Sequence, residues 1–196
     1  MNNVVIDACC LINLLAAEDI LSKPSVQTTK LKVTSSGNVS STGAVLHVAQ
    51  IIAAESMYLL QPDLDDPSKL FKSPINLDPY FKAGALHRCD IEGGEETSLF
   101  IAYATKLDDG EAACLAIAKN RGWSIATDDL PATSMANQDG VTVLTTSQLL
   151  KQWARNTKAT RRQITEALLK IQKFAKFAPR PNSPEANWWI SQIAGK

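Results

Sequence analysis

The stretch Val4-Val5-Ile6-Asp7 is an apolar run that ends in an acid, and the same pattern returns far along the chain as Trp123-Ser124-Ile125-Ala126-Thr127-Asp128-Asp129. Short apolar runs of this kind predict buried β-strands. In an open α/β sheet, the carboxyl ends of the strands line the crevice where ligands bind. We therefore expect the acids at these two strand ends to converge on one site, and converging carboxylates are typical of a metal site.

Strands and helices alternate along the rest of the chain. The spacing of apolar residues predicts helices over 8–17, 44–60, 95–106, 112–120, 131–137 and from 147 onward, with further strands over 85–91 and 141–144. A loop is expected over 61–80, and a short strand or surface hairpin at 30–33 within the Ser/Thr-rich segment 22–43. This order predicts an α/β fold, a three-layer sandwich with a mostly parallel central sheet flanked by helices.

Composition and charge describe a chain that buries an ordinary core. The 196 residues are 45% hydrophobic, and Lys plus Arg balance Asp plus Glu at 20 each. The apolar runs are interrupted by polar residues, and the first residues lack the pattern of a secretory signal, so we expect a cytoplasmic protein with no membrane segment. Residues 151–180 carry nine basic residues and one acid. We predict an α/β domain over 1–154 and a basic helical extension over 155–196.

The cysteines and histidines argue against a zinc centre. The four cysteines lack the C-x-x-C spacing of zinc sites, and the chain has only two histidines. We expect the cysteines to be buried free thiols that pack as small apolar residues. Any metal should be held by oxygen ligands, which favours Mg²⁺ or Mn²⁺.

Two of the acids have ordinary structural explanations beside the functional one. Asp7 could cap the helix that follows it, or it could bind a cation that offsets the cost of burying a carboxylate. Glu111 lies three residues after Asp108, which matches a helix capping box.

The other acids are harder to explain by capping. Glu55 falls in the apolar stripe of the helix predicted over 44–60, where packing alone would favour an apolar residue. Asp128 and Asp129 could cap the next helix, but one cap is enough and adjacent acids repel. The surplus of acids favours a bound cation.

The order of these acids resembles the PIN domain family. The likeness spans roughly residues 3–154 and is carried by Val4-Val5-Ile6-Asp7-Ala8-Cys9-Cys10-Leu11-Ile12-Asn13, Glu55, Leu107-Asp108-Asp109-Gly110-Glu111-Ala112 and Ala126-Thr127-Asp128-Asp129. Most members of this family are metal-dependent ribonucleases, and they include the toxins of many bacterial toxin–antitoxin pairs. The resemblance implies an Mg²⁺- or Mn²⁺-dependent endoribonuclease that hydrolyses RNA phosphodiester bonds.

The resemblance also implies which residues act. It makes the catalytic acids Asp7, Glu55, Glu111 and Asp129, and it makes the metal ligands Asp7, Glu55, Glu111, Asp128 and Asp129. Asp109 is an alternative auxiliary acid to Asp128, and Thr127 places a hydroxyl close to the site. An antitoxin protein is the implied partner, beside the RNA substrate.

The basic extension offers two further expectations. Its candidates for RNA binding are Lys151, Arg155, Lys158, Arg161 and Arg162, and the alternative is a solvated helix face. The apolar residues Trp188, Trp189 and Ile190 could contact a partner or form a homodimer, or they could pack on their own domain.

Two other functions remain open from the sequence. A non-catalytic RNA-binding or regulatory protein can share the fold, since fold does not fix function. A hydrolase with an aspartyl nucleophile would need a second Asp two residues after Asp7, where Cys9 stands instead.

Overall fold

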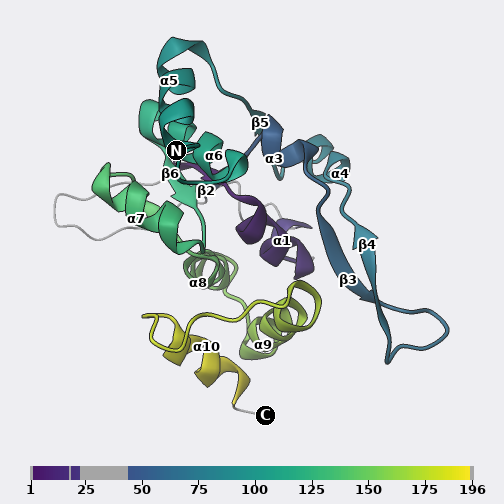
Figure 1. Ribbon diagram of the computed structural model, residues 1–196. Helices are drawn as coiled ribbons and strands as arrows, with labels where there is room; N and C mark the ends of the chain where they lie inside the picture. Colours follow the sequence, from purple (N-terminus) through teal and green to yellow (C-terminus); the bar gives the residue numbers. More distant parts are fainter. Residues whose placement is uncertain (1, 18, 23–43, 195–196) are drawn as a thin grey trace.

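A five-stranded parallel sheet forms the centre of the molecule (Figure 1), which confirms the predicted fold class. The computed structural model describes residues 2–17, 19–22 and 44–194. The strand order is β5-β2-β1-β6-β7, with bounds β1 (Asn2–Ile6), β2 (Ala44–Ala49), β5 (His87–Cys89), β6 (Ser124–Ala126) and β7 (Val143–Leu144). The central strand β1 is fully buried from Val4 to Ile6, because parallel sheets are covered on both faces.

Helices flank the sheet. They are α1 (Ala8–Ala16), α2 (Asp19–Ser22), α3 (Gln50–Ala54), α4 (Asp78–Lys82), α5 (Gly93–Tyr103), α6 (Asp109–Arg121), α7 (Leu130–Gln138) and α8 (Thr146–Asn156). Helix α6 is buried without interruption from Ala112 to Ala118 and packs against β1, β2 and β6, with α5 and α7 beside it. It ends as the sequence predicts, with Gly122 in the left-handed conformation.

The C-terminal segment packs onto the rest of the protein. It consists of α9 (Arg161–Lys170), the π-helical turn η2 (Ile171–Ala175) and α10 (Ala186–Ile193), and η2 lies against α1. Leu168 and Ile171 are fully buried in the common core. Trp189 is only 1% exposed and its ring meets the Phe177 ring edge-on, so this tryptophan packs on its own chain.

The helix predicted over 44–60 is wrong. The segment begins as strand β2, between β1 and β5, continues as the short helix α3, and ends in strand β3 (Tyr58–Pro62). A fully buried parallel strand is apolar on both faces, so its residues also satisfy a helical spacing over a short window. Residues 44–49 form a strand and not a helix because they pair with β1.

The loop predicted over 61–80 is also wrong in part. Strand β3 pairs with β4 (Leu70–Pro74) in an antiparallel hairpin that projects from the body (Figure 1), and α4 follows it. The hairpin is largely exposed, so its strands lack the apolar alternation that marks a half-buried sheet. The strand or hairpin predicted at 30–33 lies outside the described residues.

No helix in the described part of the chain has both the length and the apolar character needed to cross a bilayer.

Candidate metal centre

The predicted acids stand at the ends of strands and helices that meet at one edge of the sheet. Asp7 follows β1 and caps α1, whereas Asp129 follows β6 and caps α7. The two strands are neighbours, with Ile6 opposite Ala126, so their carboxyl ends lie side by side. Glu55 ends α3, and Glu111 lies in the first turn of α6.

Asp7 is the buried member of this set. Its side chain is 4% exposed and accepts hydrogen bonds from the Ala8 amide (2.6 Å), the Cys9 thiol (2.9 Å) and the Thr127 hydroxyl (3.2 Å). Burial raises the pKa of the Asp7 carboxyl, and these hydrogen bonds oppose that rise. Asp7 therefore serves as a cap and is also held at the site, so the two explanations of this residue are compatible.

Glu55 lies directly against the start of α6. A Cβ atom on Gly110 would stand 2.6 Å from the Glu55 Oε1 atom, closer than any side chain permits. Burial raises the pKa of Glu55, and the charges of Asp7 and Asp108 raise it further. The glycine of the Asp-Asp-Gly-Glu motif thus makes room for a carboxylate from another element.

Glu111 shows how strongly the acids repel one another. Its pKa is raised to about 7, first by burial and then by the charges of Asp108, Asp129 and Asp7. We call the following five acids the acidic cluster: Asp7, Glu55, Asp108, Glu111 and Asp129. Among the described residues, no lysine or arginine forms an ion pair with any of them. The cluster therefore carries unbalanced negative charge.

Asp108 has one role that the sequence predicts and one that it does not. Its carboxylate caps α6 by accepting from the Glu111 amide (2.9 Å), as the capping motif predicts. Its charge also raises the pKa of Asp7, Glu55 and Glu111. Asp108, rather than its neighbour Asp109, is the residue of the Asp-Asp pair whose charge acts on the site.

The two acids after β6 have different surroundings. The Asp129 amide donates to the Thr127 hydroxyl (3.1 Å), and its carboxylate accepts from Ala132 (2.8 Å) at the start of α7. The Asp128 carboxylate accepts four hydrogen bonds, from the Cys10 thiol, the Asn13 amide, and the amide and hydroxyl of Thr146. Three of these donors meet Oδ2 and one meets Oδ1, and they come from α1 and α8, so Asp128 ties these two helices together.

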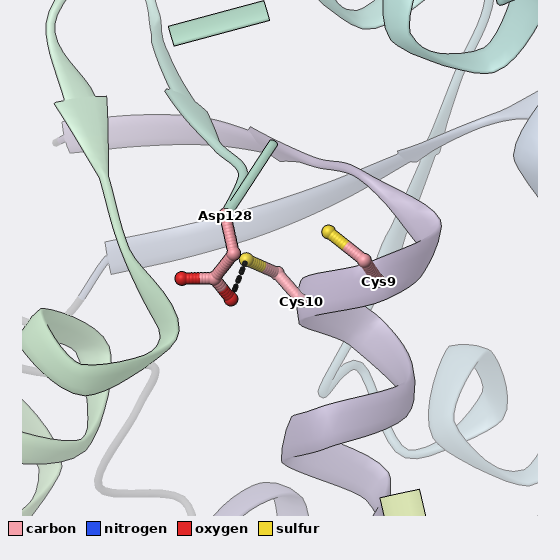
Figure 2. A group of neighbouring side chains, drawn as sticks. All are labelled: Cys9, Cys10 and Asp128. Atoms are coloured by element: carbon pink, nitrogen blue, oxygen red, sulfur yellow. Dashed lines mark hydrogen bonds between the residues drawn. The ribbon is translucent and has the colours of Figure 1, made fainter. Parts of the chain in front are cut away.

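A second group of metal-ligating side chains surrounds Asp128. The ligand atoms of Cys9, Cys10 and Asp128 all lie within 4.8 Å of one another, and Figure 2 shows the Cys10 thiol directed at the carboxylate. No three of the other acids meet the same limit within the described ranges. Burial raises the pKa of the Cys10 thiol, so it stays protonated and donates to Asp128.

The four cysteines are free thiols, as predicted. Cys10, Cys89 and Cys114 are buried, and Cys9 is half-buried beside Asp7. Burial raises the pKa of Cys114 as well, which keeps this thiol neutral in the core.

The basic candidates for RNA binding have mixed surroundings. Lys151 lies over the Trp188 ring, with Nζ 5.4 Å from its centroid, and Arg161 donates to the Ser191 carbonyl (2.8 Å), so each has an internal contact. Arg155 and Lys158 are exposed, and Arg162 lines a groove on α9.

Comparison with known proteins agrees with this architecture. A family model for the PIN domain matches residues 81–180, slightly more than half of the chain, including Asp108, Glu111 and Asp129. No curated protein and no solved structure gives a significant match. PIN domains are generally nucleases that bind divalent metals. The match, together with the parallel sheet and the acids at its carboxyl edge, shows that the chain belongs to the PIN domain family.

Proposed function

We propose that the protein is a divalent-metal-dependent ribonuclease that hydrolyses phosphodiester bonds in RNA. The observation that carries this proposal is the unbalanced cluster of Asp7, Glu55, Asp108, Glu111 and Asp129. Burial, and then the negative charges of Asp108, Asp129 and Asp7, raise the pKa of Glu111 to about 7. A bound cation would offset the repulsion between these acids. The match to the PIN domain family supports a nuclease site at this cluster.

The chemistry of the donors fits Mg²⁺ or Mn²⁺. All five side chains offer carboxylate oxygens, which these hard cations prefer over nitrogen or sulfur. The Asp128 carboxylate accepts hydrogen bonds from residues of both α1 and α8, so we assign it the role of positioning these helices instead of ligation. This narrows the ligand set that the sequence implies, and it adds Asp108.

A divalent ion held by these carboxylates would supply Lewis acidity, since it would polarise a phosphate oxygen and lower the pKa of a bound water. The protein's own residues position the carboxylates. The hydroxyl of Thr127 and the amide of Ala8 hold the Asp7 carboxylate in place and favour its charged form. Glu111 is about half protonated near neutral pH without a cation, so it must release that proton when it ligates.

The test is cleavage of labelled single-stranded and structured RNAs by the full chain with Mg²⁺ or Mn²⁺. We expect cleavage that chelation abolishes and that Glu111→Gln lowers by at least a hundredfold. The matched control is Glu95→Gln, which removes an exposed glutamate from the first turn of α5 and should keep wild-type activity. Equal activity of Glu111→Gln and wild type would refute the assignment.

A narrower proposal is that the protein is the toxin of a toxin–antitoxin pair. The experiment is genetic: expression of the wild-type chain should arrest growth, and Glu111→Gln should not. If the wild-type chain cleaves RNA but does not slow growth, the protein is a nuclease and the toxin proposal is wrong. Metal-independent RNA binding without cleavage would favour the non-catalytic alternative.

A further inference from the structure

A groove of about 460 Å³ leads away from Glu55, between the β3–β4 hairpin and the C-terminal segment. Ile12 of α1 and Phe174 of η2 contribute apolar surface, and Tyr58 and Lys72 come from the two strands of the hairpin. Its size is that of a small-ligand site. The groove therefore connects the proposed metal centre to the β3–β4 hairpin and to the C-terminal segment, neither of which carries an acid of the cluster.

The lining of this groove suits a nucleotide. Tyr58 is 42% exposed, and the Lys72 Nζ atom lies over one face of its ring, 4.0 Å from the centroid. Lys176 stands exposed at the other wall. An aromatic face flanked by cations is the arrangement with which proteins stack a base and hold the backbone of single strands.

The backbone at Lys176 is unusual. This residue directly follows η2 and adopts the left-handed conformation, with φ of 58°. A glycine would adopt this conformation with less strain than a lysine. The backbone of this turn therefore favours glycine over lysine at position 176.

A second groove, of about 680 Å³ on α9 and η2, shares Phe174 with the first. Its charged lining includes Arg161, Arg162 and Lys173, together with the acid Glu166. The C-terminal segment thus brings basic side chains to both grooves, and a cluster of acids needs such cations nearby if it is to attract a polyanion.

We propose that the groove is the subsite for the nucleotide adjoining the scissile phosphate of single-stranded RNA. The base stacks on Tyr58, and the ammonium groups of Lys72 and Lys176 hold the flanking phosphates. This inference rests on the proposed ribonuclease function and assigns the substrate's path to residues outside the acidic cluster.

The experiment is a binding titration of a fluorescein-labelled single-stranded RNA against the full chain, made cleavage-deficient by Glu111→Gln. Onto this background go Lys72→Met, Lys176→Gly and Tyr58→Leu. Each is expected to weaken binding about fivefold to tenfold, and each lysine variant to lower the slope of log affinity against log salt by about 0.7. Lys69→Met is the matched control, since Lys69 lies exposed on the same hairpin and pairs with Asp66 outside the groove. It should bind within twofold of the background.

Lys176→Gly separates binding from folding. Glycine relieves the left-handed backbone, so thermal unfolding should show a stability equal to or above that of the background while RNA affinity falls. Unchanged affinity in all three groove variants would overturn the proposal, as would a loss in Lys69→Met equal to theirs. An RNA duplex competing as well as the single strand would contradict stacking on Tyr58.

The two proposals fail in different ways. If wild-type protein cleaves RNA but the groove variants keep its KM and affinity, the subsite is wrong and the nuclease stands. If the groove variants lose affinity but wild-type protein cleaves nothing, the subsite stands as an RNA-binding groove and the nuclease is wrong.

Discussion

Gly110 shows how a single residue links the fold to the proposed site. Glycine is a poor helix former, yet it occupies the second position of α6 and is buried there. The atoms that a Cβ would meet are Glu55 Oε1 and Ile52 Cδ1, each at 2.6 Å. Glycine destabilises the helix slightly, but it leaves the space in which the Glu55 side chain approaches α6. The sequence shows the glycine but not this reason for it, because Glu55 arrives from another element.

Replacing Gly110 by alanine tests this explanation. Alanine is the better helix former by up to about 1 kcal/mol, but its Cβ would also crowd the fully buried Ile52, which offsets that gain. The end of the Glu55 side chain would be displaced. We expect metal-dependent RNA cleavage to fall at least tenfold with the melting temperature nearly unchanged. Gly94→Ala is the control, because Gly94 occupies the same position of α5 and a Cβ there meets nothing within 4 Å. Full activity of Gly110→Ala would contradict the role given to Glu55.

The sequence predicts correctly those helices and strands that neighbouring residues in the chain determine. Strand β1 and helix α6 are correct because an apolar run, a capping acid and a C-terminal glycine are local signals. Strand β2 is missed because its pairing with β1 and β5 is not local. The sequence also names the acids at the sheet edge, yet the turning of Asp128 toward Thr146 depends on where α8 packs.

Helices α5 and α6 are joined by an ion pair that yields a pH-dependent prediction. Glu96 is 1% exposed and accepts from Arg121 Nε at 2.7 Å, and this contact lowers the Glu96 pKa to about 2 from 4.5. A lowered carboxyl pKa stabilises the folded state above pH 4.5, and the contribution is lost as pH falls toward 2. Such a shift corresponds to about 3 kcal/mol.

We expect Glu96→Gln to lower the free energy of unfolding by about 3 kcal/mol at pH 7, and by much less near pH 2, in urea titrations. Asp78→Asn breaks an exposed ion pair with Arg88 and should cost under about 1 kcal/mol. A difference between wild type and Glu96→Gln that does not change with pH would show that the pair does not control the Glu96 pKa.

At the scale of the molecule, the C-terminal segment and the sheet share one core. Leu168, Ile171 and Trp189 are buried with residues of β1 and α1. The family match also runs to residue 180, past the boundary predicted at 154. Removing residues 155–196 would expose apolar surface as well as remove charge, so single substitutions are the better test of this segment.

Trp189→Ala should lower the stability of the whole protein by about 3 kcal/mol, because a large buried side chain is lost. Ile190, its neighbour, is 58% exposed, and Ile190→Ala should change stability little. Calorimetry should give one unfolding transition that shifts as a unit in Trp189→Ala. Two transitions, with only one of them shifted, would show instead that residues 155–196 fold as a separate unit.

Electron paramagnetic resonance of Mn²⁺ measures whether the clustered acids hold a divalent cation. We expect saturable binding of Mn²⁺ to the wild-type chain and to Glu95→Gln, with at least tenfold weaker binding to Glu111→Gln and Asp129→Asn. Binding of equal strength in all four proteins, or none in the wild type, would contradict it.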